Sequence, residues 1–160
     1  MSKSTDYTAE EWKTISSAPM LAGLLVSVAD LSGPIGMVKE AMAVVKSVIE
    51  TASTTSNELI RAVAEGVKAG AGRPDASELG SDSASARAIL IERCKQAAAL
   101  VGQKSPSEAE EYKRWLVSLA RKAAEASKEG GFLGIGGTPV SEAEKGALQD
   151  IAAALGVSAA

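Results

Sequence analysis

Apolar residues recur at helical spacing along most of this sequence, between short breaks made of glycine, proline and serine. Three of the expected helix starts carry a capping box, in which Ser or Thr is followed three residues later by Glu: Thr8 with Glu11, Ser105 with Glu108, and Ser141 with Glu144. Such pairs satisfy the free N–H groups of a helix N-terminus, so they mark where a helix begins. The sequence therefore predicts an all-α fold, a compact bundle of about six or seven helices.

The breaks place the expected helices at roughly residues 9–16, 19–29, 34–51, 57–69, 83–101, 106–128 and 142–155. Pro19 is expected to end or kink the first helix, because proline has no N–H to donate. Ser56 is expected to cap the fourth helix, and Gly102 to end the fifth. The polar, glycine-containing residues 69–83 are expected to form a surface crossover within one domain spanning residues 1–160.

The helix expected over residues 34–51 has apolar residues on two sides. One row is Ile35, Val38, Met42, Val45 and Ile49, a second is Met37, Ala41, Val44 and Val48, and the polar third is Lys39, Glu40, Lys46, Ser47 and Glu50. A helix with so much apolar circumference belongs in the middle of a bundle or in an interface. We therefore expect the helices near residues 20–50 to lie at the centre of the bundle, and the helix over residues 34–51 to be covered on two sides. We also expect the protein to form a homo-oligomer.

Composition removes several kinds of chemistry. The chain has no histidine, which is the commonest general base and a frequent ligand of transition metals. Its one cysteine, Cys94, lies among apolar helical positions, so we expect a buried, unreactive thiol. The 17 basic and 20 acidic residues are interleaved, which gives no electrostatic footprint for nucleic acid. Since no constellation of catalytic residues is present either, we expect no enzyme, no cofactor and no bound metal.

Two further segments bear on localisation. Residues 1–12 contain no apolar stretch after a basic segment, so they do not have the pattern of a secretory signal. The most apolar region, residues 18–28, is too short to span a bilayer. The sequence therefore predicts a cytoplasmic protein.

Residues 130–139, GGFLGIGGTP, separate two strongly helical segments. In one interpretation a glycine ends the preceding helix and the apolar residues fold onto the core. In a second, backbone N–H groups of the loop bind an anion, although the lysine of a phosphate loop is missing after the last glycine. In a third, the loop is a contact element, and its interaction residues are Phe132, Leu133 and Ile135.

Residues near both ends form a recognisable pattern. At one end these are Trp12, Ala18-Pro19-Met20 and Gly33, and at the other GGFLGIGG, Val140-Ser141, Glu144, Ala147-Leu148 and Ile151. The pattern resembles a family of small, uncharacterised bacterial all-helical proteins, which implies a helical fold and no particular activity. The ending VSEAEKGALQDIAAALG is also superficially similar to TerB-like tellurite-resistance domains, which are helical and bind metal through acidic residues. The acidic positions that such a site needs are not recognisable here, so the resemblance transfers no metal ligand.

These observations favour a non-enzymatic structural or protein-interaction module that self-associates, with residues 130–139 as the contact element. The alternative is a binding module for an apolar ligand or a membrane surface. Its groove is expected to be lined by Met20, Leu24, Met37 and Met42, because methionine side chains adapt to irregular ligands.

Overall fold

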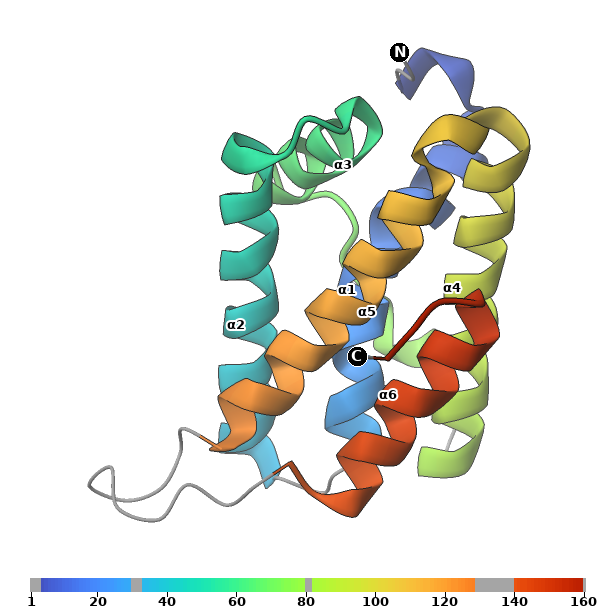
Figure 1. Cartoon of the computed structure of the whole chain (residues 1–160). Coiled ribbons are helices and arrows are strands. Elements are labelled where there is room, and N and C mark those ends of the chain that lie inside the picture. The colour runs from blue at the N-terminus through green and yellow to red at the C-terminus, as the bar shows by residue number, and fades with distance from the viewer. Residues whose placement is uncertain (1–3, 30–32, 80–81, 129–139, 160) are drawn as a thin grey trace.

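The computed structural model describes residues 4–29, 33–79, 82–128 and 140–159 (Figure 1). These residues form six α-helices: α1 (Ala9–Ala29), α2 (Gly33–Thr54), α3 (Glu58–Lys68), α4 (Ser83–Lys104), α5 (Pro106–Lys128) and α6 (Glu142–Leu155). Two short 3-10 turns, Ser4–Asp6 and Ala76–Glu78, complete the regular structure, and the described residues contain no strand. The predicted all-α bundle is confirmed.

Helix α1 forms the centre of the bundle. It packs against each of the other five helices, with α5 crossing over it and α4 beside it (Figure 1). Helix α2 lies at one edge, where it packs against α1, α3 and α5. The expectation that residues 20–50 lie at the centre is therefore right for the second half of α1 and wrong for α2.

The break expected at Pro19 is absent, because α1 is one continuous helix and Pro19 is buried inside it. A proline in a helix interior leaves the carbonyl four residues earlier without its donor. That carbonyl belongs to Ile15, and it accepts a hydrogen bond from the hydroxyl of Tyr112 on α5 at 2.8 Å. A tertiary contact thus supplies the donor that the local sequence lacks, and the two helices predicted around Pro19 are one.

Two of the predicted capping boxes are present. The Thr8 N–H donates to Glu11 at 2.8 Å and the Glu11 N–H donates to the Thr8 hydroxyl at 3.2 Å. Ser141 and Glu144 make the same reciprocal pair at the start of α6, which ends at Gly156 in the left-handed conformation, with φ of 69°. These helix ends were encoded locally and were predicted correctly.

The other expected helix ends differ in detail. At the start of α5, Glu108 closes no box with Ser105. Its Oε1 instead accepts from the Leu59 N–H of α3 at 3.0 Å. The cap of α3 is Asn57 rather than Ser56, since the Asn57 side chain accepts from the Ile60 N–H at 2.9 Å. The N-terminus of α3 is therefore held by a cap of its own and by a carboxyl of α5.

Gly102 does not end the fifth expected helix, because α4 continues through it to Lys104. A glycine inside a helix costs only about 1 kcal/mol relative to alanine, which tertiary packing easily offsets. Glycine acts differently in the crossover after α3, where Gly72 has a φ of +74° and lies against the Ser16 carbonyl of α1. A Cβ atom at this position would lie 2.3 Å from that oxygen, so only glycine fits.

Candidate functional site

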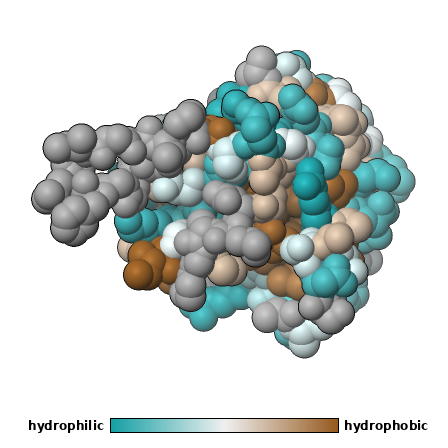
Figure 2. All heavy atoms as spheres, turned by 90° about the horizontal axis from the view of Figure 1, so that it is seen from below, coloured by the Kyte–Doolittle hydropathy of each residue, from teal (hydrophilic) through white to brown (hydrophobic). Residues whose placement is uncertain are grey.

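Helix α2 carries an exposed apolar face. Its large side chains are exposed by 76% at Ile35, 42% at Met37, 58% at Val38, 68% at Met42 and 39% at Ile49. Seen from below, the bundle brings hydrophobic residues to the surface among hydrophilic ones (Figure 2). The expectation that α2 is covered on two sides is therefore wrong. The first row is exposed at Ile35, Val38, Met42 and Ile49, and the second is buried only at Val44 and Val48.

The buried side of α2 contains a carboxyl group. Glu40, Val44 and Val48 follow one another at intervals of four residues, so they share one side of the helix, and all three are buried. The hydroxyl of Ser27 on α1 donates a hydrogen bond to the Glu40 carboxyl. Sequence periodicity had placed Glu40 on the polar, solvated third of α2, and the partner on α1 explains why it lies inside instead.

A hollow of about 270 Å³ lies between α1, α2 and the crossover that follows α3. The described residues that line it are Met20, Gly23, Leu24, Ser27, Met37, Val38, Ala41, Val44 and Pro74. We call this hollow the α1–α2 groove. Three of the four residues expected to form an apolar groove, Met20, Leu24 and Met37, come together here. The fourth, Met42, does not line the groove and belongs to the exposed row of α2.

At the α1–α2 groove, helices α1 and α2 approach each other closely at Gly23 and Val44. Gly23 of α1 faces Val44 of α2, and a Cβ atom added to Gly23 would lie 2.4 Å from the Val44 Cγ2 atom. No side chain larger than a hydrogen atom fits there unless the Val44 side chain or α2 moves. The glycine thus lets the two helices meet beneath the groove.

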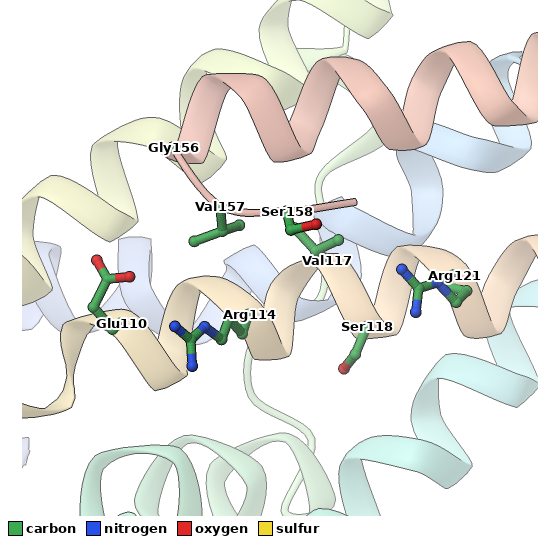
Figure 3. Close-up of a pocket in the computed structure, with 8 residues that line it drawn as sticks. All are labelled: Glu110, Arg114, Val117, Ser118, Arg121, Gly156, Val157 and Ser158. Atoms are coloured by element: carbon green, nitrogen blue, oxygen red, sulfur yellow. The ribbon is translucent and has the colours of Figure 1, made fainter. Parts of the chain in front are cut away.

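A second hollow, of about 430 Å³, lies between α5 and the residues that follow α6 (Figure 3). Arg114 and Arg121 reach it from α5, and the Arg121 guanidinium donates to the Ala159 carbonyl. Glu110 lies at the same hollow, and a hydrogen bond from Lys113 at 2.7 Å lowers the pKa of its carboxyl. Acidic and basic groups are thus mixed at this hollow.

The Cys94 thiol is shielded from solvent. Cys94 is fully buried, and burial raises the pKa of its thiol to about 12, as expected for an unreactive core residue. Among the described residues, no three Cys, Asp or Glu side chains form a group able to hold a metal ion.

Helix α1 is long and apolar enough to cross a membrane, but 56% of its most apolar window is buried inside the bundle. Residues 18–28 alone are too short to span a bilayer, whereas α1 extends that apolar segment to 21 residues.

The interaction residues predicted in the glycine-rich segment, Phe132, Leu133 and Ile135, lie outside the described residues, as do all of residues 130–139. Comparisons with known protein families, curated proteins and solved structures find no match to this chain. The functional argument therefore rests on the two surfaces built by α2, its exposed row and the α1–α2 groove. The row was visible in the sequence as a 3-4-3-4 spacing, but periodicity alone does not say which of two apolar rows faces outward.

Proposed function

We propose that this protein is a non-enzymatic interaction module that self-associates through the exposed row of α2, defined as Ile35, Val38, Met42, Val45 and Ile49. The observation that carries the proposal is that the exposed large apolar side chains of the described residues all lie on one helix, α2. Contiguous apolar patches of this kind mark binding sites more often than they occur on inert surface. Residues 130–139, the contact element expected from the sequence, remain a second candidate for the same role.

The spacing of the row suits a second helix. Its residues alternate at intervals of three and four, as do the a and d positions of a coiled coil. The row extends for about 21 Å along the helix at a rise of 1.5 Å per residue. That length provides two heptads, which is enough for one helix to pack along another but not for a free-standing coiled coil. A second copy of α2 carries the complementary row.

The energy of covering this face is consistent with a reversible complex. The exposed fractions of the four most exposed side chains of the row, Ile35, Val38, Met42 and Ile49, together equal about 2.4 complete side chains. At about 1.5–3 kcal/mol for each fully buried side chain, two copies gain roughly 7–14 kcal/mol. Association costs about 4–15 kcal/mol in lost freedom of motion. We therefore expect a concentration-dependent dimer rather than a permanent one.

The charges around the row favour a protein partner over a lipid surface. Lys39 and Lys46 flank the row, but Lys46 lies 3.9 Å from Glu50, and Lys122 and Glu125 of α5 face the same side of α2. Helices that bind membrane surfaces carry a polar face rich in basic residues. Mixed charge next to an apolar row is instead typical of the rim of a protein interface.

The test is sedimentation velocity of the full chain over a range of protein concentrations. We expect the wild type to shift from 16.3 kDa toward twice that mass as concentration rises. The double variant Ile35→Asp with Met42→Asp should stay monomeric, because both side chains are largely exposed and their replacement leaves the core intact. A matched control, Ala99→Asp with Ala153→Asp, adds the same charge at exposed positions on α4 and α6 and should associate like the wild type.

Two results would contradict the proposal. One is a wild type that is monomeric at every concentration, and the other is an α2 double variant that associates normally. The variant Phe132→Ser with Leu133→Ser tests the glycine-rich segment in the same assay. If it alone abolishes association, the contact element is residues 130–139 and not α2. A third result would assign the row to a membrane surface instead. In that case the wild type would co-sediment with anionic vesicles, and the α2 double variant would not.

A further inference from the structure

The α1–α2 groove has an unusual distribution of polar atoms. Of the described residues that line it, only Ser27 has a polar side chain. The others are Met20, Gly23, Leu24, Met37, Val38, Ala41, Val44 and Pro74, none of which offers an N–H or O–H donor from its side chain. Among the described lining side chains, a molecule held in this groove therefore meets mainly apolar atoms and a single hydroxyl oxygen.

Ser27 can offer that molecule only an acceptor. A serine hydroxyl has one hydrogen and two lone pairs. The hydrogen of Ser27 is donated to the buried carboxyl of Glu40, which lies on the side of α2 that faces α1. Among the described lining side chains, the remaining lone pairs of Ser27 are the one hydroxyl acceptor available to a ligand. A ligand whose polar end donates a hydrogen bond is satisfied here, whereas a ligand whose polar end only accepts is not.

The Ser27 acceptor and the lack of donors among the described lining side chains favour some polar ligand groups over others. A carboxylate or phosphate would meet no donor among the described lining side chains. An ammonium group has three donors for one acceptor, so two of its hydrogens would be buried without partners. An uncharged hydroxyl needs one acceptor, and Ser27 supplies it.

The volume limits the length of the apolar part. An engineered cavity of about 150 Å³ accommodates benzene, which has six heavy atoms. By the same ratio, the groove volume of about 270 Å³ accommodates roughly ten heavy atoms. Met20 and Met37 line the groove on opposite helices, and their unbranched side chains adjust readily to a flexible chain.

We propose that the α1–α2 groove binds a short, uncharged alkyl alcohol of about eight carbon atoms, with the alcohol O–H donated to the Ser27 hydroxyl oxygen. The alkyl chain lies along Met20, Leu24 and Met37, and the crossover residue Pro74 covers one side. This binding site is additional to the self-association proposed above. Val38 belongs to both surfaces, but Ile35 and Met42, the two residues changed in the association test, do not line the groove, so the two proposals are tested separately.

The test uses calorimetric titration of the full chain with 1-octanol and, as a matched anion, octanoate. We expect saturable binding of octanol and at least about tenfold weaker binding of octanoate, since the anion leaves its oxygens without donors. Amide NMR spectra should shift at Met20, Leu24 and Met37 on addition of octanol. Absence of saturable octanol binding, or equal affinity for the two compounds, overturns the proposal.

Two variants locate the site. Ala41→Phe places a ring at the exposed edge of the groove and should abolish octanol binding, whereas Ala99→Phe, at an exposed position on α4, should leave it unchanged. Ser27→Ala should weaken octanol binding by roughly two- to tenfold and reduce the preference over octanoate. If Ser27→Ala fails to fold because Glu40 loses the hydrogen bond from Ser27, the Ala41→Phe result decides alone, and unchanged binding in that variant overturns the proposal. The α2 double variant with Ile35→Asp and Met42→Asp should still bind octanol, which separates this test from the test of self-association.

Discussion

The hydroxyl of Tyr112 donates a hydrogen bond at 2.8 Å to the carbonyl of Ile15, the acceptor that Pro19 leaves without a helical donor. Both Tyr112 and Ile15 are completely buried, so water cannot take the place of this bond. The contact therefore does more than join α5 to α1. It allows a proline in the interior of the central helix, where the missing N–H would otherwise leave a buried carbonyl unsatisfied.

Replacing Tyr112 by phenylalanine should destabilise the protein by about 1–3 kcal/mol, because the Ile15 carbonyl is then buried without a partner. The ring and its packing are retained, so the loss reports the hydroxyl alone. Urea unfolding followed by circular dichroism measures the change in the free energy of unfolding. A loss within about 0.5 kcal/mol, the scatter typical of surface substitutions, would show that the carbonyl is satisfied in another way.

A double-mutant cycle isolates the link to the proline. Pro19→Ala restores an N–H that can donate to the Ile15 carbonyl within the helix. In the Pro19→Ala background, Tyr112→Phe should therefore cost less than it does in the wild type. Additive effects of the two substitutions would show that the tyrosine and the proline act independently.

The close approach of α1 and α2 gives a second prediction. Gly23→Ala would place a Cβ atom 2.4 Å from the Val44 Cγ2 atom, so the Val44 side chain or α2 itself must move, at a cost of about 1–3 kcal/mol. Gly102→Ala is the matched control on α4, because a Cβ atom there meets no atom within 4 Å. It should stabilise the protein by roughly 0.5–1 kcal/mol through helix propensity. Opposite shifts in thermal unfolding temperature are expected, and destabilisation by both variants would contradict the packing argument.

The fold was predictable from the sequence wherever the signals were local. The pairs Thr8 with Glu11 and Ser141 with Glu144 lie within one helical turn, and both form as expected. The continuation of α1 through Pro19 was not predictable, because its cause is a tyrosine 97 positions from Ile15. The same holds for Glu108, which hydrogen-bonds to the backbone of α3 rather than to its own helix start.

The candidate site was predictable in composition but not in orientation. The apolar rows of α2 were evident, as were three residues of the α1–α2 groove, because helical spacing identifies residues that share a side. Which row faces the bundle depends on the partners that α1 and α5 offer. The hydrogen bond from Ser27 to Glu40 shows why a count of apolar residues is insufficient, since it fixes a carboxyl on the buried side of α2.

The N-terminus of α3 gives a third prediction. Asn57 accepts from the Ile60 N–H at 2.9 Å and donates to the Glu111 carboxyl at 3.0 Å. Asn57→Ala removes both bonds and should cost about 1–2 kcal/mol, as loss of a helix cap does. Asn57→Asp keeps the acceptor but loses the donor and adds a carboxyl beside Glu111, so it should recover only part of that stability. Equal stability of Asn57→Asp and the wild type in urea unfolding would rule out a contribution from Glu111.

Two buried acidic protons make the fold sensitive to alkaline pH. Burial raises the pKa of the Cys94 thiol from 9.0 to about 12, and raises the pKa of the Tyr112 hydroxyl well above 10.0. The folded state therefore keeps both protons at pH values where the unfolded chain has released them. Their contribution to stability is complete below about pH 9 and is lost as the pH rises from there toward the pKa values of the folded state.

We therefore expect the free energy of unfolding to fall as the pH rises above about 9, by up to about 1.4 kcal/mol per pH unit for each of the two groups. In Cys94→Ala the same decline should begin about one unit higher, where the tyrosine of the unfolded chain titrates. The comparison uses the change relative to each protein's own stability at pH 7, because removing the thiol also alters packing at every pH. Urea unfolding between pH 7 and 11 measures both curves. Parallel curves for the wild type and Cys94→Ala would mean that the thiol releases its proton as readily in the folded protein as in the unfolded chain.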